Sequence, residues 1–153
     1  MHLTSPAFGD SGQIPSEFGA DGHGVSPPLR VGDVPTGAVT LALVVQDPDI
    51  PRAKWPSGIF DHWVVWNLPA NLAELLPGQI PPGDVGLSSY GTHSYVPPAP
   101  PKEHRYYFYL YALDVRLDLP VDTTAAAGLF AAMVGHVLEV SCLMGRYTRV
   151  ASE

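Results

Sequence analysis

The sequence has 153 residues, enough for one domain with a sizeable core and too few for two domains of ordinary size. Its 8 Lys and Arg residues against 15 Asp and Glu residues give a formal net charge of −7, which argues against a nucleic-acid-binding protein, since that role needs a basic face. Hydrophobic residues make up 46% of the chain and charged residues 15%, a composition that excludes a disordered protein.

Glycine and proline are frequent along the whole chain. The 15 glycines and 17 prolines favour many short strands joined by turns over a protein of long helices. Cys142 is the only cysteine, which excludes an intramolecular disulfide and a cysteine-rich zinc site, and we expect its side chain to be a small buried hydrophobe. No apolar run approaches the length of about 18 residues that a membrane span needs, and the polar start of the chain predicts no signal peptide. We therefore expect a cytoplasmic protein.

The first half of the chain contains two clear strand signals. Residues 1–35 are rich in glycine and proline and are predicted to be mostly loop. The apolar, β-branched run at residues 38–45 ends at Asp47-Pro48 and is typical of a buried strand. Residues 62–68 predict a second strand, which stops at Pro69.

The clearest strand signal lies at residues 105–113, where the side chains alternate between two faces. One face carries Tyr106, Phe108, Leu110 and Ala112, and the other carries Tyr107, Tyr109, Tyr111 and Leu113. The tyrosine face either packs against a second sheet or is exposed as a homodimer interface, because tyrosine is enriched at interfaces. Of these two interpretations we prefer packing against the second sheet.

The end of the chain has a different pattern. Asp122-Thr123-Thr124 offers side chains that can cap the start of a helix. Apolar residues then follow at helical spacing, at Leu129, Phe130, Met133, Val137, Leu138 and Cys142. We predict a helical region that ends near Gly145, followed by a short strand at residues 146–150. With one late helix available for crossovers, the pattern predicts a mainly β protein, an antiparallel β-sandwich rather than a parallel sheet.

Polar side chains gather at the ends of the three predicted strands. Asp47 and Asp49 follow the first strand, His62 begins the second, and His104 and Tyr106 begin the third. If neighbouring strands bring these ends together, two carboxylates, two imidazoles and a phenol share one rim. The sequence alone leaves that convergence open, because such residues taken singly are more often turn formers, solvated side chains or core.

These segments, in this order, resemble the phosphatidylethanolamine-binding protein family, and more closely its bacterial and archaeal Raf-kinase-inhibitor-like branch. The resemblance covers roughly residues 13–150, so we treat residues 1–153 as a single domain with its core at about 13–150. The matching segments are Asp47-Pro48-Asp49-Ile50-Pro51, residues 62–69 and residues 100–106, with residues 25–29, 135–138 and 145–147 in support.

The resemblance implies a β-sandwich of a large and a small sheet, with Greek-key connections and a C-terminal helix. It also implies a surface pocket for a phosphate-like anion or phospho-headgroup, and a cis bond between Ile50 and Pro51, which prolyl amides tolerate. The residues that match the pocket-lining motifs are Asp47, Asp49, His62, His104 and Tyr106, with Tyr95 and the loop at residues 97–101 as one wall.

One departure from the family pattern concerns how an anion would be held. The family's proline-rich loop usually begins with two glycines whose backbone N–H groups can cradle an anion. Here the stretch is Val96-Pro97-Pro98-Ala99, and prolines have no N–H to donate. We therefore expect His62 and His104 to supply most of the attraction, with Asp47 and Asp49 orienting the rings. A free imidazole titrates near about pH 6.5, so sulfate is expected to bind more tightly at pH about 5.5 than at pH about 8.

The sequence thus predicts a non-enzymatic phospho-ligand or anion-binding protein, which modulates a kinase, a protease or another protein partner. It implies no cofactor, no nucleic acid and no membrane span. Two enzyme alternatives stay open. A hydrolase using the Asp/His pocket lacks a G-x-S-x-G motif, and a metal-dependent enzyme using His62, His104 and Asp47 has suitable ligand types without a diagnostic spacing.

Overall fold

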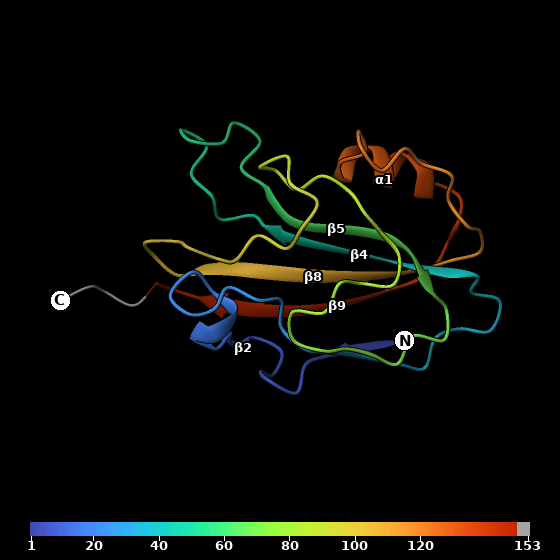
Figure 1. Ribbon diagram of the computed structural model, residues 1–153, viewed down its shortest axis with the longest axis horizontal. Helices are drawn as coiled ribbons and strands as arrows, with labels where there is room; N and C mark the ends of the chain where they lie inside the picture. The colour runs from blue at the N-terminus through green and yellow to red at the C-terminus, as the bar shows by residue number, and fades with distance from the viewer. Residues whose placement is uncertain (150–153) are drawn as a thin grey trace.

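The largest sheet is built from the segments that are most apolar or aromatic. In this computed structural model, which describes residues 1–149, the long strands are β4 (Thr40–Asp47), β5 (Phe60–Pro69), β8 (His104–Leu113) and β9 (Val137–Tyr147). They run side by side in Figure 1. With two short strands, β2 (Gly12–Gln13) and β7 (Asp84–Val85), they form a six-stranded sheet in the order β2-β9-β8-β4-β5-β7. All pairs are antiparallel except β2 with β9.

A smaller sheet covers one face of the large one. It consists of β1 (His2–Thr4), β3 (Leu29–Gly32) and β6 (Glu74–Leu75), in the order β1-β3-β6. Leu3, Leu29 and Leu75 of these strands join one buried cluster with the inward side chains of the large sheet. The predicted mainly β sandwich with a large and a small sheet is confirmed. Strands within residues 1–35 were not predicted, because segments of two to four residues are too short to show a period-two pattern.

The second face of the large sheet is partly covered by a helix. Helix α1 (Ala126–Met133) lies beside β5 in Figure 1, and its Leu129 and Met133 pack with Val44 of β4 and Trp66 of β5. Strand β4 is therefore buried on both faces, which explains why its sequence is a continuous apolar run rather than an alternating one. A helix of eight residues, the longest in residues 1–149, is far too short to cross a membrane.

The predicted helical region is real but shorter than expected. Helix α1 ends at Met133, and Gly135 adopts a positive φ of 81° before the chain enters β9. Val137, Leu138 and Cys142, which were predicted to be helical, lie in this strand, as do Arg146 and Tyr147, while Val150 falls outside the described residues. Apolar residues spaced three or four apart are ambiguous when a segment is half exposed. This segment forms a strand because it pairs with β8, from His104↔Tyr147 to Leu113↔Val137.

The tyrosine face of β8 points away from the small sheet. Its rings form a ladder, with centroids 5.8 Å apart for Tyr107–Tyr109 and 6.4 Å for Tyr109–Tyr111. Packing of this face against the second sheet was therefore a wrong prediction, because alternation separates two faces without saying which one is inward. Cys142, opposite Tyr109 on β9, is exposed, which also corrects its expected burial. A homodimer through this face stays a prediction.

The peptide bond between Ile50 and Pro51 is trans, since no bond within residues 1–149 is cis. The expectation of a cis bond here was wrong. Prolyl amides still favour trans by about 0.5–1 kcal/mol, so cis needs a surrounding structure that enforces it. The Pro51 carbonyl instead accepts hydrogen bonds from the backbone of Lys54 and Trp55, in a turn that follows the trans bond.

Candidate functional site

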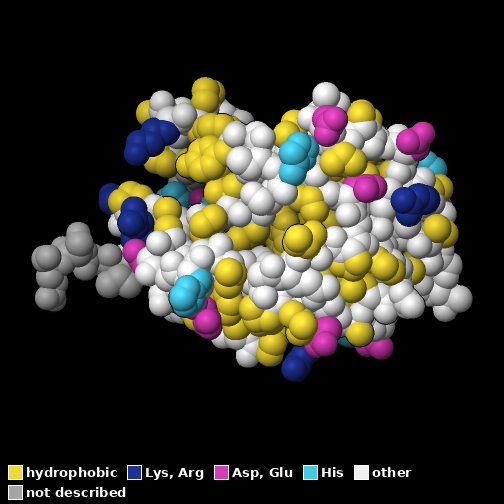
Figure 2. Space-filling view, viewed as in Figure 1, with side chains coloured by type: hydrophobic (Ala, Val, Ile, Leu, Met, Phe, Trp, Pro, Cys, Tyr) yellow, Lys and Arg dark blue, Asp and Glu magenta, His cyan; other side chains and the backbone are white. Residues whose placement is uncertain are grey.

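Three segments that are distant in sequence meet at one end of the large sheet. Strand β4 runs antiparallel to both β5 and β8, so the end of β4 at Asp47 lies beside the starts of the other two. The side chains there line a cavity of about 750 Å³. We call it the Asp47 cavity, and five predicted site residues line it: Asp47, Asp49, His62, His104 and Tyr106. Figure 2 shows histidine and acidic side chains recessed between hydrophobic and basic ones toward the left of the molecule.

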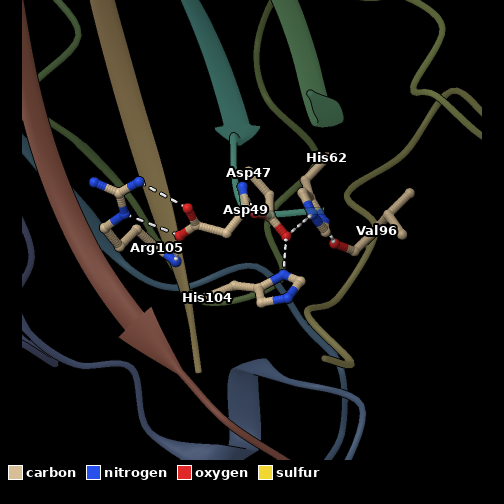
Figure 3. Close-up of polar contacts among 6 residues, drawn as sticks. All are labelled: Asp47, Asp49, His62, Val96, His104 and Arg105. Atoms are coloured by element: carbon tan, nitrogen blue, oxygen red, sulfur yellow. Dashed lines mark hydrogen bonds and ion pairs between the residues drawn. The ribbon is translucent and has the colours of Figure 1, made fainter. Parts of the chain in front are cut away.

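Asp47 is the buried centre of the cavity floor. Only 2% of this residue is exposed. Its Oδ2 accepts a hydrogen bond from Nδ1 of His104 at 2.6 Å, and its Oδ1 accepts one from the backbone N–H of Asp49 at 2.8 Å (Figure 3). A buried carboxylate is tolerated only when it is paired and hydrogen-bonded, and both conditions are met here. Asp47 thereby fixes the His104 ring, as predicted, and leaves Nε2 of His104 without a hydrogen bond to residues 1–149.

His62 is held differently from His104. Its Nδ1 lies 2.7 Å from the carbonyl oxygen of Val96 (Figure 3). A carbonyl only accepts, so Nδ1 carries the proton and donates it. Nε2 is buried and has no hydrogen bond within residues 1–149, and its distance of 4.0 Å from Oδ2 of Asp47 is too long for one.

The charge of His62 differs from the expectation. Burial lowers its pKa to about 4, although the Val96 carbonyl and the Asp47 carboxylate both favour the charged form. His62 is therefore neutral between pH 5.5 and pH 8, and its Nε2 is a bare acceptor. The prediction that both histidines gain charge over this range is wrong for His62, because the sequence does not reveal how completely the ring is buried.

Tyr106 lies between the two histidines. Its ring meets His62 edge to face at 5.1 Å between centroids and stacks on His104 at 6.5 Å. Burial, followed by the charge of Asp47, raises the pKa of its phenol far above the usual range, so the hydroxyl keeps its proton. The Tyr106 hydroxyl is available as a hydrogen-bond donor to a ligand, since it makes no hydrogen bond within residues 1–149.

Asp49 does not orient a histidine, which corrects the prediction for this residue. It pairs with Arg105 instead: Oδ1 accepts from Nη2 at 2.7 Å, and Oδ2 accepts from Nε at 2.9 Å and from the backbone N–H at 2.8 Å (Figure 3). These contacts with Arg105 hold the pKa of Asp49 below its ordinary value. Arg105 was missed as a site residue, although its position next to His104 and its charge opposite to Asp49 were visible in the sequence.

The lining of the Asp47 cavity also contains aromatic and proline side chains. Phe60 contacts His62 and Tyr90, each at 4.7 Å between ring centroids, and Pro97, Pro100 and Pro101 complete the lining. Basic and acidic residues are equally numerous in the lining, three of each, although the whole chain carries a net charge of −7. They are Lys54, Lys102 and Arg105 against Asp47, Asp49 and Glu103. The cavity is thus less acidic than the protein around it.

Tyr95 is the one predicted site residue that lies outside the Asp47 cavity. It lines a neighbouring hollow of about 220 Å³, here called the Tyr95 groove, together with Trp63 and His93. Its hydroxyl donates to the carbonyl of Phe18 at 2.9 Å, and its ring packs on Trp63 at 5.5 Å. The next residue, Val96, lines the Asp47 cavity instead, so the extended backbone sends the two neighbours to opposite sides.

Metal ligands were also predicted as an alternative at this site. Across residues 1–149, no three or more His, Cys, Asp and Glu side chains come together in an arrangement that would hold a metal ion. The Asp47, His62 and His104 set is instead organised by hydrogen bonds to one another and to the backbone.

Comparisons with known proteins agree over nearly the whole chain. The family model described as phosphatidylethanolamine-binding protein matches residues 4–148. A UPF0098 protein from Chlamydia muridarum is 43% identical over 148 residues, covering 96% of this chain and 98% of that protein. A UPF0098 protein from Methanothermobacter thermautotrophicus is 43% identical over 156 residues, covering 97% and 99%.

Solved structures show the same fold. The crystal structure of CT736 from Chlamydia trachomatis, a phosphatidylethanolamine-binding protein homologue, superposes with a TM-score of 0.94 at 41% identity and covers 97% of both chains. That of Escherichia coli YbcL, described as a new member of the mammalian PEBP family, gives 0.81 at 25% identity, covering 97% of this chain and 98% of that one. On its sequence and its fold, the chain belongs to the phosphatidylethanolamine-binding protein family.

Proposed function

We propose that the protein binds a phosphate-like anion, free or as part of a small phospho-ligand, in the Asp47 cavity without chemically changing it. One observation carries this proposal: the buried Asp47 carboxylate holds His104 at 2.6 Å beside the unpartnered hydroxyl of Tyr106. Two side chains that can donate hydrogen bonds are thereby fixed in place at the floor of a concave site.

Donors for an anion come from three sources in this cavity. Protonation of His104 turns its Nε2 from an acceptor into a charged donor, and the Tyr106 hydroxyl donates in any protonation state of the histidine. Lys54 and Lys102 in the lining add positive charge without an acidic hydrogen-bond partner among residues 1–149. These groups replace the backbone donors that Pro97 and Pro98 cannot provide.

The acidic residues of the cavity serve the site indirectly in this proposal. Both oxygens of Asp47 accept hydrogen bonds from the protein, and Asp49 is engaged by the guanidinium of Arg105. Their charges are therefore compensated before an anion arrives. Asp49 in turn holds Arg105 at the rim, where the cation contributes to the local potential.

A non-enzymatic role is favoured by the composition of the lining. An Asp–His pair activates a neighbouring hydroxyl or thiol in hydrolases that form a covalent intermediate. The described lining residues of the Asp47 cavity include no Ser, Thr or Cys, so Asp47 and His104 have no such side chain to activate there. The same pair is well suited to hold one ring rigidly for binding.

Calorimetric titration with inorganic phosphate at pH about 6 tests the proposal. Replacing His104 by alanine removes a donor that is charge-assisted when protonated, and affinity is expected to fall about tenfold or more. His93→Ala is the matched control, because His93 is an exposed histidine of the Tyr95 groove and its loss leaves the Asp47 cavity unchanged. No measurable binding by the parent protein, or equal affinities for the parent and His104→Ala, would contradict the proposal.

A further inference from the structure

Two hydrogen-bond acceptors face each other at the floor of the Asp47 cavity. They are Nε2 of His62 and Oδ2 of Asp47, and they lie 4.0 Å apart (Figure 3). Oδ2 already accepts from His104, while Nε2 has no partner within residues 1–149. A buried polar atom without a partner is uncommon in folded proteins, and one reason for it is a ligand group that completes it.

Neither atom can supply a hydrogen to a ligand. The single proton of neutral His62 is on Nδ1, because the Val96 carbonyl at 2.7 Å requires a donor there. Asp47 receives the Nδ1–H of His104 at 2.6 Å and the backbone N–H of Asp49, as an ionised carboxylate does. A ligand oxygen that carries only lone pairs would therefore be repelled at this point.

We infer that the floor of the Asp47 cavity selects ligands whose most deeply inserted group carries a hydrogen-bond donor, and that for a phosphate ligand this group is a P–OH. The inference rests on the proposed function and narrows it to protonated phosphate, either inorganic phosphate or a phosphate monoester. The one hydrogen of a P–OH is donated to Nε2 of His62, the acceptor without a partner within residues 1–149, since Oδ2 of Asp47, 4.0 Å away, already accepts from His104.

The donors and the acceptors of the cavity then contact different oxygens of the phosphate. The Tyr106 hydroxyl, and Nε2 of His104 when that ring is protonated, donate to the unprotonated phosphate oxygens, and the P–OH donates to Nε2 of His62. Sulfate and sulfate esters satisfy the first set but not the second, because they carry no proton near neutral pH. A phosphate diester also lacks the P–OH. The site is thus expected to distinguish ligands of equal charge and similar shape.

Methyl phosphate and methyl sulfate are the matched probes. At pH about 5.5 methyl sulfate is a monoanion and methyl phosphate is mainly a monoanion of similar size, which alone carries a P–OH, since the second phosphate pKa is about 6. We expect methyl phosphate to bind at least about tenfold more tightly, the effect of leaving a buried acceptor unpaired in the sulfate complex. The ratio of the two affinities cancels the effect of the protein's own charge state.

That cancellation covers all the titratable groups that face the floor, because both probes are measured on the same protein at the same pH. They come from β4 and the residues after it, from β5, from β8 and from the rim: Asp47 and Asp49, His62, His104, Arg105 and Tyr106, and Lys54, Tyr90, Lys102 and Glu103.

Replacing His62 by phenylalanine removes the acceptor and keeps an aromatic ring between Phe60 and Tyr106. The preference for methyl phosphate is expected to fall below about threefold. His93→Phe is the control, since the Nδ1 of His93 also meets a backbone carbonyl, that of Val85 at 2.9 Å, but outside the Asp47 cavity. This variant is expected to keep the full preference.

Long-range proton–nitrogen NMR of the parent protein provides a readout that does not depend on the folding of a variant. His62 is expected to show a protonated Nδ1 and an unprotonated Nε2, and the Nε2 signal is expected to move on addition of methyl phosphate and not of methyl sulfate. A protonated Nε2 in the free protein at pH about 5.5 overturns the inference.

The affinities for the two esters distinguish a failure of this inference from a failure of the proposed function. Equal affinities for the two esters, or an unchanged preference in folded His62→Phe, overturn the inference while the anion site stands. If neither ester binds the parent protein, the inference fails together with the proposed function.

Discussion

The Asp47 cavity and the Tyr95 groove are lined by neighbouring residues, Val96 in the first and Tyr95 in the second, yet the polar groups of the two hollows are placed differently. In the Tyr95 groove the tyrosine hydroxyl donates to the Phe18 carbonyl and Nδ1 of His93 contacts the Val85 carbonyl. In the Asp47 cavity, three polar groups have no hydrogen-bond partner within residues 1–149: Nε2 of His62, Nε2 of His104 and the hydroxyl of Tyr106.

The contrast shows that a surface cavity is not by itself evidence of a binding site in this fold. Both hollows contain a histidine and a tyrosine, so composition does not separate them either. They differ in the burial of the histidine nitrogen that lacks a partner within residues 1–149: Nε2 of His62 is buried, whereas His93 is exposed and water can reach its ring. A polar atom that is buried without a partner is the rarer of the two cases, and a ligand group that completes it is one explanation.

The largest expected effect concerns the acid that organises the cavity floor. Asp47→Ala removes a buried carboxylate and leaves His104 without its partner, so the free energy of unfolding is expected to fall by about 3 kcal/mol. Asp49→Ala is the matched control. It breaks a more exposed ion pair with Arg105 and should cost less than about 1 kcal/mol.

Urea unfolding monitored by circular dichroism at pH 7 compares these two variants with the parent protein. Equal losses for Asp47→Ala and Asp49→Ala would show that the buried pair contributes no more than a surface ion pair.

The second effect follows from the low pKa of His62. In the unfolded chain an imidazole titrates near about 6.5, and in the folded protein burial lowers the pKa of His62 to about 4. The unfolded state therefore binds more protons between these values, so the contribution of His62 to stability is complete above pH 6.5 and is lost as the pH falls. The loss is expected to reach about 3 kcal/mol by pH 4.

Carboxylates titrate in the same window, so the His62 contribution is measured as a difference. Urea unfolding of the parent protein and of His62→Phe from pH 7 to pH 4 isolates it, and the variant should show the smaller fall. His93→Phe should follow the parent curve, because the His93 side chain is exposed. Parallel curves for the parent and His62→Phe would mean that His62 titrates normally in the folded protein.

Much of the fold was predictable because three strands carry strong local signals. The apolar run of β4, the aromatic alternation of β8 and the proline that ends β5 each specify a strand without help from the rest of the chain. Strand β9 was not predictable in the same way. Its apolar spacing suits a half-exposed helix equally well, and only its pairing with β8 selects the extended form.

The candidate site residues also differ in how far the sequence predicts their roles. Asp47, His62, His104 and Tyr106 were identified as candidates because they lie at strand ends, and antiparallel pairing brings those ends together. The protonation pattern of His62 could not be predicted, because it depends on the carbonyl of Val96, which a loop without periodicity places 2.7 Å from the ring. Tyr95 was misplaced for a similar reason, since one residue's difference along an extended segment changes the side to which a side chain points.

The smallest effect is also the sharpest comparison of the two hollows, because it uses the same substitution in each. Tyr106→Phe removes a hydroxyl that has no protein partner, so stability should be unchanged while the affinity for inorganic phosphate falls about fivefold, the effect of one hydrogen bond. Tyr95→Phe removes a hydroxyl that donates to Phe18, so stability should fall by about 1 kcal/mol with phosphate affinity unchanged. Calorimetry and urea unfolding on both variants test the four outcomes together. If Tyr95→Phe weakened phosphate binding as much as Tyr106→Phe, the Tyr95 groove would be part of the site, and the presence or absence of a protein partner for the tyrosine hydroxyl would not separate the two hollows.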